Sequence, residues 1–402
     1  MSAPKICIFT ETYYPVVGGG ETQAQLLAEG LVARGFSVII LTRRSDVSLP
    51  KVEQVGDVSV YRLGPIGHGQ LKKWGLIFSS LPALIRWRWQ YDLIFVSGYR
   101  IVGITAVLVA KLLGKKVVLK ADSQGEMSGD FFKDGLARIK LAPSWLPFKL
   151  FLGVRNWILQ RADAFTAISP EIAEEMRANG VNPQIIHPVP NSVDTDRFQP
   201  ATSQCKRALR QRLGLPLDHT IAIYTGRLVS YKGLPLLLAV WRALHDKYQD
   251  SNLLLLGTGG LDIHNCEKEL KTYVEEHGLQ NTISFTGAVQ NVPDYLQAAD
   301  IFVFPTEDDA LPSSLIEAMA CRLPVVTTPV GAIKTIVVNE LNGLSVEPGN
   351  FQQLYEALEL MITDKELAWR LAQAGRQTVH EQYAADIVIK QYSELFKNLT
   401  DI

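Results

Sequence analysis

The sequence predicts an α/β protein with two domains, each built around an open parallel β-sheet. A chain of 402 residues is longer than one hydrophobic core usually supports, and a hydrophobic content of 47% is enough to fill two cores. Short apolar, β-rich runs alternate with helical patterns along both halves, which is typical of βαβ units. One such unit is complete in residues 301–328, where a buried strand, a polar loop, a helix and a second strand follow one another.

The first half begins with a β-rich run at 5–10, a loop at 11–20 and an amphipathic helix at 22–34. Gly35 ends that helix, and residues 36–41 form the next strand. The glycines of the loop invite a dinucleotide-binding interpretation, but G-x-G-x-x-G is absent and no acidic residue ends the second strand. Further strands of this half are expected at 58–61, 93–96, 116–119 and 163–167, and a helix is expected at 101–113.

A connector at 188–200 separates the two halves, because three prolines in thirteen residues make it stiff. It follows a helix that Ser169 and Pro170 open and that runs to residue 178. We therefore expect domains at 1–190 and 201–380, a linker at 191–200 and a last helical segment at 381–402. Asp194 and Asp196 also match the metal motif D-x-D, but so short a pattern is common by chance and here it lies inside the connector.

The second half shows the same alternation, with strands expected at 221–225, 253–256, 282–286, 301–304 and 324–328. Helices are expected at 234–247, 313–320, 354–361, 366–374 and 383–399. The turn at 226–233 follows the first of these strands and contains Arg227 and Lys232. Two cations at a strand end suit a diphosphate, because charge-assisted hydrogen bonds to its oxygens are strong. On composition alone the same residues are two solvated bases in a turn.

The most informative stretch, residues 304–349, contains an acidic loop that leads into the helix at 313–320. The carboxylates of Asp309 in the loop and Glu317 in the helix can accept hydrogen bonds from a vicinal diol. Taken alone, two acids at this spacing are more often charges that stabilise the start of a helix. Four backbone N–H groups at the helix entry can bind an anion or a sugar hydroxyl, those of Ala310, Leu311, Ser313 and Ser314.

Composition excludes several classes of protein. The four cysteines, Cys7, Cys205, Cys266 and Cys321, lie far apart without metal-like spacing and predict reduced thiols in a cytoplasmic protein. The start of the chain lacks the pattern of a signal peptide, and the longest apolar run is too short to span a bilayer. Nucleic acid is not an expected partner, because no basic helix, zinc spacing or aromatic RNA motif is present.

Residues 309–349 resemble, without a gap, the hallmark of family 4 of the retaining glycosyltransferases, an E-x7-E pair within EGLPxxLLEAMACGxPVVAT. Residues 15–21 resemble the P-x-x-G-G-x-E of that family, residues 188–200 its P-N-G-V-D-x-x-x-F-x-P, and residues 226–233 its G-R-L-x-x-x-K-G. The resemblance covers almost the whole chain. The chain departs from the family pattern where Asp309 replaces the first Glu, Ser192 and Arg322 replace Gly, and Thr335 replaces Glu.

The resemblance implies the GT-B fold, in which two Rossmann-like domains with parallel sheets face each other across a cleft. It places the segment at 381–402 as a helix that crosses back to the first domain. It also implies a retaining, metal-independent hexosyltransferase that needs no cofactor and moves a sugar from a nucleoside-diphosphate sugar to a hydroxyl acceptor. We expect such an enzyme to act in the synthesis of a polysaccharide or a glycolipid.

The resemblance assigns roles to the residues that match the family motifs. Arg227 and Lys232 would neutralise the departing diphosphate, and Asp309 would act with them by holding the sugar. Glu317 would bind the ribose, and backbone groups near Gly257 and Val289 would read the base. Glycines in the first domain would let the backbone approach the substrates. The donor-binding set comprises Gly18, Gly19, Gly257, Val289, Ala310, Leu311, Pro312, Ser313, Ser314 and Glu317.

Five polar residues of the first half are candidates for the acceptor or sugar side: Glu21, Ser97, Lys120, Asp122 and Glu126. Many relatives have a histidine at the position of Asp122, so the role of that histidine does not transfer to this chain. Any of Lys120, Asp122 and Glu126 could contact a sugar, and each could equally be a solvated loop charge.

Two other classes of function stay open. One is a different enzyme of the same fold, since an epimerase would convert the donor without an acceptor. A phosphorylase would need a pyridoxal lysine, which the sequence does not identify. The other class is a non-catalytic sugar-nucleotide-binding protein. Intact Arg227, Lys232 and Glu317 favour an enzyme, whereas Asp309 and the missing histidine favour a non-catalytic protein.

Two stretches, 71–89 and 131–161, combine tryptophan and other apolar residues with basic ones. The second stretch has six basic residues and one acidic residue, Asp134, and the two stretches hold five of the seven tryptophans. Such faces are typical of helices in a membrane interface. The same residues could instead pack on the sheet while lysine and arginine reach the solvent. The first interpretation predicts a protein peripheral to the inner face of the plasma membrane, bound to anionic lipid, with a lipid-linked acceptor.

Overall fold

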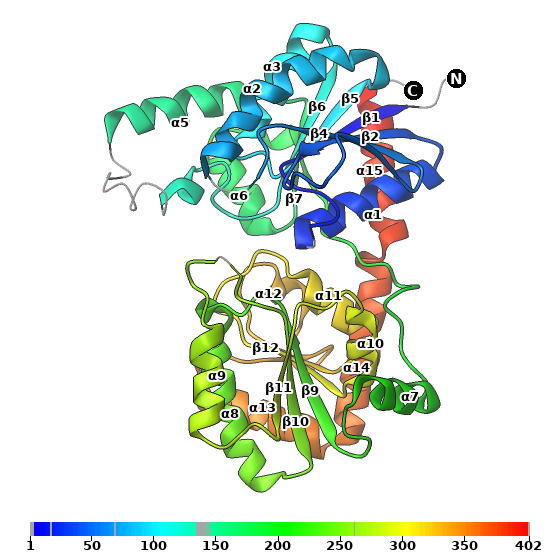
Figure 1. The fold of residues 1–402 in the computed structure, drawn as a ribbon, viewed down its shortest axis with the longest axis vertical. Helices are drawn as coiled ribbons and strands as arrows, with labels where there is room; N and C mark the ends of the chain where they lie inside the picture. The colour runs from blue at the N-terminus through cyan, green and yellow to red at the C-terminus, as the bar shows by residue number, and fades with distance from the viewer. Residues whose placement is uncertain are drawn as a thin grey trace. The chain divides into compact units, whose positions relative to one another are not determined.

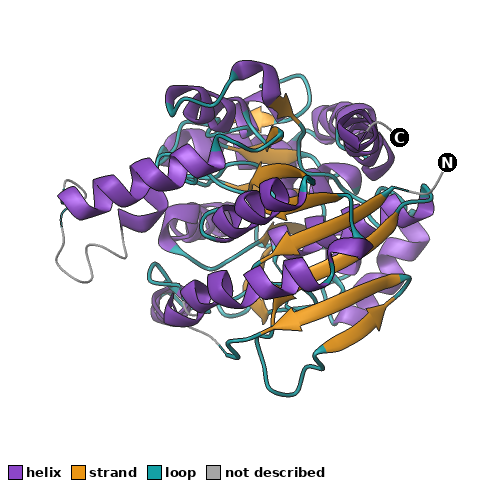
Figure 2. Ribbon diagram, turned by 90° about the horizontal axis from the view of Figure 1, so that it is seen from above, coloured by secondary structure: helices purple, strands orange, loops and turns teal. Residues whose placement is uncertain are grey.

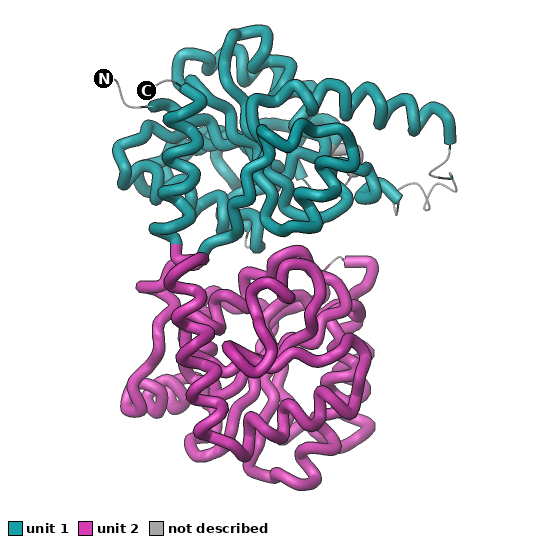
Figure 3. The backbone as a smooth tube through the Cα atoms, turned by 180° about the vertical axis from the view of Figure 1, so that it is seen from behind, with its two compact units in different colours: residues 1–192, 385–402 teal, residues 193–384 magenta. Residues whose placement is uncertain are grey.

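The computed structural model describes residues 4–16, 18–67, 70–133, 142, 145–260 and 262–400. The chain divides into two compact units, which we call unit 1 (residues 1–192 and 385–402) and unit 2 (residues 193–384), coloured separately in Figure 3. Each unit is built on a largely parallel sheet with helices on both faces of the strands (Figures 1 and 2). The predicted fold class of two Rossmann-like domains is therefore confirmed.

The eight described strands of unit 1 form one sheet in the order β3-β4-β2-β1-β5-β6-β7-β8. Their bounds are β1 Lys5–Thr10, β2 Ser37–Arg43, β3 Val52–Val55, β4 Val58–Leu63, β5 Leu93–Ser97, β6 Lys116–Ala121, β7 Ala164–Ala167 and β8 Ile186–Pro188. One edge of the sheet differs from the rest, because β3 pairs with β4 in the antiparallel sense. The sequence does not predict β3, because its residues are exposed or half-buried and form no apolar run.

The helices of unit 1 pack on both faces of this sheet. In Figure 1, α1 and α15 pack together on one side of the strands, and α2, α3 and α5 pack together on the other. Their bounds are α1 Gly19–Ala33, α2 Gln70–Arg86, α3 Val102–Leu113, α5 Leu146–Leu159, α6 Pro170–Ala178 and α15 Ala385–Thr400, with short 3-10 turns η1 Arg88–Gln90, η2 Asp130–Phe132 and η3 Pro183–Ile185. Ser169 caps α6 by accepting the N–H of Ile172, as its position before a proline predicts.

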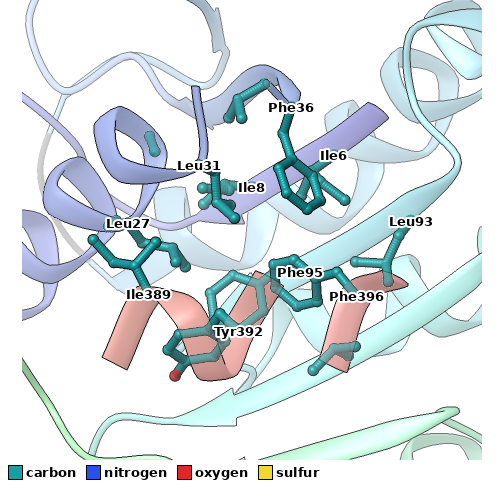
Figure 4. Close-up of a cluster of buried hydrophobic side chains, with 14 of the residues drawn as sticks. Ile6, Ile8, Leu27, Leu31, Phe36, Leu93, Phe95, Ile389, Tyr392 and Phe396 are labelled. Atoms are coloured by element: carbon teal, nitrogen blue, oxygen red, sulfur yellow. The ribbon is translucent and has the colours of Figure 1, made fainter. Parts of the chain in front are cut away.

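The core between α1, α15 and the sheet is shown in Figure 4. The ring of Phe95 on β5 lies 5.3 Å from the ring of Tyr392 and 5.5 Å from the ring of Phe396, both on α15. Gly30 permits the close approach of α1 and α15, because a Cβ there would lie 2.2 Å from Cδ1 of Ile389. The last helix of the chain therefore completes the core of unit 1.

The six described strands of unit 2 are all parallel, in the order β11-β10-β9-β12-β13-β14. Their bounds are β9 Thr220–Thr225, β10 Ser251–Leu256, β11 Ile283–Gly287, β12 Ile301–Phe304, β13 Val325–Thr327 and β14 Leu344–Ser345. The helices are α7 Ser203–Leu213, α8 Leu234–Lys247, α9 Glu267–Glu276, α10 Val292–Ala298, α11 Ser313–Ala320, α12 Ile333–Ile336, α13 Phe351–Thr363 and α14 Lys365–Gln382, with the turn η4 Ser230–Lys232.

Each sheet has a point where the strand order changes direction, between β1 and β5 in unit 1 and between β9 and β12 in unit 2. Open α/β sheets bind ligands outside the carboxyl ends of their strands at such a point. The predicted acceptor-side residues lie at or after the ends of β1, β5 and β6, and most of the predicted donor-side residues follow β9 to β12. The topology thus gathers each set at one edge of its own sheet.

The two tryptophan-rich stretches contain α2 and α5. Residues 134–141, 143 and 144 of the second stretch lie outside the described residues. Within the part of the chain that the structure describes, no helix is both long enough and apolar enough to cross a membrane.

Candidate functional site

Lys232 and Asp309, two of the predicted catalytic residues, form an ion pair at the carboxyl edge of the sheet of unit 2. Lys232 ends η4 and is 7% exposed, and its Nζ donates to Oδ2 of Asp309 at 2.7 Å. The same Nζ donates to the carbonyl oxygen of Asp308 at 2.7 Å. Gly233 allows this packing, since it has a φ of +70° and a Cβ there would lie 1.9 Å from the carbonyl oxygen of Pro305. The loops after β9 and β12 are thereby held together.

Arg227, the other predicted cation, lies in the loop after β9, and its side chain is 59% exposed. Its Nη1 forms an ion pair with Asp262, and its Nη2 donates to the hydroxyl oxygen of Tyr231 at 2.7 Å. Tyr224 on β9 donates its hydroxyl to the carbonyl oxygen of Arg227 at 2.8 Å, and its ring stacks 5.6 Å from the ring of Phe304. The backbone of Arg227 is therefore fixed to the core while its guanidinium group stays at the surface.

Glycines join the loops that follow β9, β10 and β11. Gly257, a predicted donor-binding residue, has a φ of +134°, and a Cβ there would lie 1.9 Å from the carbonyl oxygen of Gly226. Its N–H donates to the carbonyl oxygen of Gly287 at 3.0 Å. Val289, the other predicted base-side residue, follows two positions later and is half-buried. These contacts hold together the loops at the carboxyl ends of β9, β10 and β11.

Helix α11 begins at Ser313 and has Pro312 at its N-cap position, without a side-chain cap. An N-terminus without a capping side chain can direct its first N–H groups at an anion or a hydroxyl. The loop before α11 closes around Gly331, because a Cβ there would lie 1.9 Å from the carbonyl oxygen of Asp309. The residue after Gly331 donates its N–H to the carbonyl oxygen of Ala310 at 2.8 Å. The predicted loop residues are therefore anchored beside the helix start.

Glu317 lies one turn inside α11 and is half-buried. Burial raises the pKa of its carboxyl group from 4.5 to about 7, and the charge of Arg197 opposes that rise. The predicted neighbours Ser313 and Ser314 are half-buried, whereas Leu311 is buried. A partly desolvated carboxylate gains from accepting the hydrogen bonds of a sugar diol, which replace those that it has lost to water.

Four of the five predicted acceptor-side residues form one cluster at the carboxyl edge of the sheet of unit 1. Asp122 follows β6 and accepts hydrogen bonds from Oγ of Ser97 at 2.9 Å and from Nζ of Lys120. The N–H of Asp122 donates to Oε1 of Glu126 at 3.2 Å. Lys120 and Glu126 are both buried, so the interpretation of these two as solvated loop charges is wrong.

The fifth residue, Glu21, lies in the first turn of α1, which begins at the predicted Gly19. Its carboxylate accepts a hydrogen bond from Oγ1 of Thr12. A Cβ at Gly18 would lie 2.4 Å from Oε2 of Glu21, so a side chain at this position would displace the carboxylate. Gly18 therefore lies against the carboxylate of Glu21.

Burial and pairing shift the pKa values of the two buried members of the cluster. Burial lowers the pKa of Lys120, but the charge and hydrogen bond of Asp122, together with Tyr392 and Glu126, more than offset this and the pKa is raised. Burial raises the pKa of Glu126, and the guanidinium of Arg100, with Nε 3.1 Å from Oε1, opposes that rise only in part. Lys120 is therefore charged near neutral pH and can balance the charge of Asp122.

Sequence reasoning missed two residues that hold the loop of this cluster. Glu175 on α6 accepts the N–H groups of Gly125, Met127 and Ser128 at 2.7, 2.9 and 2.8 Å. The buried Arg155 on α5 donates to carbonyl oxygens of the same loop. No local pattern marks Glu175, because its partners lie 47 to 50 positions away in the sequence.

Among the described residues, no three histidine, cysteine, aspartate or glutamate side chains gather as a metal site requires. Asp194 of the D-x-D pattern uses Oδ1 to accept the N–H groups of Asp196 and Arg197, both at 3.0 Å. That carboxylate closes a turn in the connector.

Two family models match the chain. The model for Glycosyltransferase Family 4 matches residues 17–197, and the model for Glycosyl transferases group 1 matches residues 206–378. A D-inositol 3-phosphate glycosyltransferase of Xylanimonas cellulosilytica is 29% identical over 235 residues, which are 57% of this chain and 55% of that protein. An uncharacterized glycosyltransferase of Haemophilus influenzae is 29% identical over 44% of this chain and 48% of its own length. The chain thus spans about half the length of these curated relatives.

Solved structures share the fold over nearly the whole chain. A sucrose-phosphate synthase of Thermosynechococcus elongatus has a TM-score of 0.82 at 22% identity and covers 99% of each chain. The HepE protein of Anabaena, solved in complex with UDP and glucose, has a TM-score of 0.76 at 18% identity and covers 98% of this chain and 99% of its own. At these identities the likeness establishes the fold alone.

Proposed function

Because this chain belongs to the family 4 glycosyltransferases, we propose that it moves a sugar from a nucleoside-diphosphate sugar to a hydroxyl acceptor with retention of anomeric configuration. The observation that carries this proposal is the set of groups at the carboxyl edge of the sheet of unit 2. Arg227 and Lys232 supply positive charge, α11 supplies its first N–H groups, and Glu317 supplies a half-buried carboxylate. These groups match the diphosphate and the ribose of a sugar nucleotide.

Arg227 and Lys232 stabilise the negative charge that develops on the departing diphosphate. Cations beside a developing negative charge stabilise the transition state, and removing one such donor typically costs about 3 kcal/mol. The two side chains are themselves the cations that the leaving group needs. The reaction that we propose is therefore independent of a metal.

Asp309 and the first N–H groups of α11 hold the transferred sugar, and Glu317 accepts the hydroxyls of the ribose. The bond from the anomeric carbon to the phosphate oxygen breaks while the bond to the acceptor oxygen forms on the same face of the sugar. The acceptor proton passes to the leaving phosphate oxygen, so the step balances without a protein nucleophile. UDP is the first nucleotide to test, because the structural neighbour HepE was solved with UDP and glucose.

Unit 1 contributes the acceptor side through Asp122. Its carboxylate accepts hydrogen bonds from Ser97 and Lys120, which fix its position beside the end of β6. An ionised carboxylate can only accept hydrogen bonds, so Asp122 suits a sugar hydroxyl that donates one. Oε1 of Glu126 accepts the backbone N–H of Asp122 at 3.2 Å.

A membrane surface is the proposed location of the acceptor, and α5 supports this proposal. An apolar stripe runs along its solvent side, with residues spaced three or four positions apart that are 57% to 67% exposed: Leu146, Leu150, Val154 and Trp157. The helix has no acidic residue, and its Lys149 is exposed. Arg161, just beyond its end, lies 3.3 Å over the ring of Trp157. In Figures 1 and 3, α5 extends from the edge of unit 1.

The alternative interpretation requires these apolar side chains to pack on the sheet. The side chains of this stripe are exposed instead. Exposing several large apolar groups to water is unfavourable, and a helix with basic and aromatic residues gains most from lying in a lipid interface. Trp74 of α2 packs 5.7 Å from the ring of Phe151 on α5, which joins the two tryptophan-rich helices. We place this face on an anionic cytoplasmic membrane, where a lipid-linked acceptor for a polysaccharide or glycolipid would be available.

A transfer assay separates these functions. The protein is incubated with UDP-glucose, GDP-mannose or ADP-glucose in EDTA, with simple glycosides and lipid-linked sugars as acceptors. Release of nucleoside diphosphate together with an α-linked product from an α-linked donor supports the proposal. Conversion of the donor to an isomer without an acceptor would instead identify an epimerase. Donor binding with neither reaction would identify a non-catalytic sugar-nucleotide-binding protein.

A further inference from the structure

Arg227 is the more exposed of the two cations at the proposed donor site, and it pairs with Asp262. The proposed reaction gives Asp262 no role. The side chain of Arg227 is 59% exposed, yet its Nη1 pairs with Oδ2 of Asp262. Its Nη2 donates to the hydroxyl oxygen of Tyr231 at 2.7 Å. The guanidinium group is thus engaged before any ligand arrives.

Asp262 lies in the loop between β10 and α9, and its position is fixed by its second oxygen. Oδ1 accepts the N–H of His264 at 3.0 Å, so Oδ2 is directed at Arg227. The ring of His264 packs edge-on 5.5 Å from the ring of Tyr231, which ties this loop to the loop after β9. The Asp262 side chain is only 16% exposed, whereas that of Arg227 is far more accessible. The carboxylate is therefore the fixed partner and the guanidinium the movable one.

The two cations of the site are balanced in the same way. Lys232 pairs with Asp309, as Arg227 pairs with Asp262. A diphosphate that binds here must take both cations from carboxylates, and it must approach two negative charges that repel it. Asp309 has a proposed role toward the sugar. Asp262 has none, so its charge acts on the diphosphate alone.

We propose that Asp262 is a competing carboxylate that holds Arg227 in the ligand-free protein and weakens the binding of the nucleoside diphosphate. This inference rests on the proposed function, because it takes the diphosphate as the ligand of Arg227. The pair sets the affinity for both donor and product, since each brings a diphosphate to the same guanidinium. Recapture of Arg227 by Asp262 assists departure of the product diphosphate after transfer.

The test compares wild type with Asp262→Asn by calorimetry against UDP, GDP, ADP and uridine, in EDTA. Asparagine keeps Oδ1 as an acceptor for the N–H of His264, so the loop is preserved while the charge is removed. We expect the variant to bind the recognised diphosphate roughly threefold to tenfold more tightly than wild type. Uridine lacks phosphate, so its affinity should be the same for both proteins. The difference for the diphosphate should shrink in high salt, because salt screens exposed charges.

Asp218→Asn is the control for removing one carboxylate from an arginine pair, because Asp218 pairs with the similarly exposed Arg207 at 3.1 Å and precedes β9, at the opposite edge of the sheet. It should leave nucleotide affinity unchanged. Equal or weaker diphosphate binding by Asp262→Asn, in a protein whose melting temperature without ligand matches wild type, would overturn the inference and assign Asp262 to positioning Arg227. If neither protein binds any of the three diphosphates, the proposed function fails and the inference fails with it.

Discussion

At the scale of single residues, Glu317 illustrates a conflict between stability and binding. Burial raises the pKa of its carboxyl group from 4.5 to about 7. The folded protein therefore holds this proton more tightly than the unfolded chain does. Below pH 4.5 the group is protonated in both states, and as the pH rises through about 7 the folded state loses the advantage that the bound proton gave it.

Replacing Glu317 by glutamine should separate the two effects. The pKa difference between 4.5 and about 7 corresponds to about 3 kcal/mol. We expect the variant to be more stable than wild type by up to about that amount at pH 8, with the difference vanishing toward pH 4. Urea unfolding of the ligand-free proteins across this pH range measures it. A stability difference between variant and wild type that is the same at pH 4 and pH 8 would mean that the pKa of Glu317 is not raised.

The same variant should bind nucleotide less tightly and without the pH dependence of wild type. An ionised carboxylate accepts both hydroxyls of a ribose, whereas a protonated one has lost part of its acceptor capacity. Wild-type affinity for the diphosphate should therefore rise between pH 6 and pH 8, around the raised pKa of Glu317 of about 7. A wild-type affinity that falls over this range would contradict the placement of Glu317 at the ribose.

Which residues carry charge at the site could be predicted from the sequence, because the loop at 226–233 and the loop before α11 have local patterns. Their pairing could not. Arg227 pairs with Asp262, which is 35 positions away in the sequence, and Lys232 pairs with Asp309, which is 77 positions away. Such pairs depend on which strands are neighbours in the sheet, and no short pattern encodes that order.

At the scale of elements, the accuracy of the prediction follows the apolar pattern. Helices α8 and α11 have the predicted bounds, since each presents a buried apolar face and is preceded by a residue that breaks helices. Helix α7 is not predicted at all. Its one buried residue is Arg210, so it has no apolar stripe to recognise. Hydrogen bonds of a guanidinium group take the place of hydrophobic packing there.

The role of Arg210 gives a test at this scale. Its Nη2 pairs with Oδ2 of Asp300 at 2.6 Å, and its Nε donates to the carbonyl oxygen of Ala298 at 2.9 Å. Replacing Arg210 by alanine removes these buried hydrogen bonds to Asp300 and Ala298 and should lower the free energy of unfolding of unit 2 by about 3 kcal/mol. Arg207 on the same helix is the control, because its exposed pair with Asp218 should contribute less than about 1 kcal/mol. Equal effects of the two changes would show that the buried network does not hold α7.

Helix α5 provides the second test at this scale. Replacing Leu150 and Val154 by glutamine should weaken binding to vesicles of phosphatidylcholine with phosphatidylglycerol by at least about tenfold, because two apolar side chains no longer enter the lipid. Leu341→Gln in unit 2 is the control, since Leu341 is 61% exposed and Leu150 is 62% exposed. Co-sedimentation measures the partition. Wild type that stays in the supernatant with anionic vesicles at low salt would remove the membrane proposal.

At the scale of the whole molecule, the division into two units could be anticipated from the length of the chain and its proline-rich connector. The family could be recognised because its motifs are short and lie in loops. That α15 completes the core of unit 1 does not follow from its residues, since any apolar helix face would satisfy the same pattern. The resemblance supplied that expectation, and the contacts of Tyr392 and Phe396 with Phe95 give its physical basis.

The central claim is that unit 2 binds a nucleoside diphosphate through its own cations. The measurement that tests it most directly is the thermal stability of wild type and Arg227→Ala in EDTA, with UDP, GDP and ADP. We predict that one nucleotide stabilises wild type, by about 2.7 kcal/mol at one hundred times its dissociation constant, and that most of this response is lost in the variant. An equal response in both proteins, or a response only when a divalent metal is added, would contradict the claim.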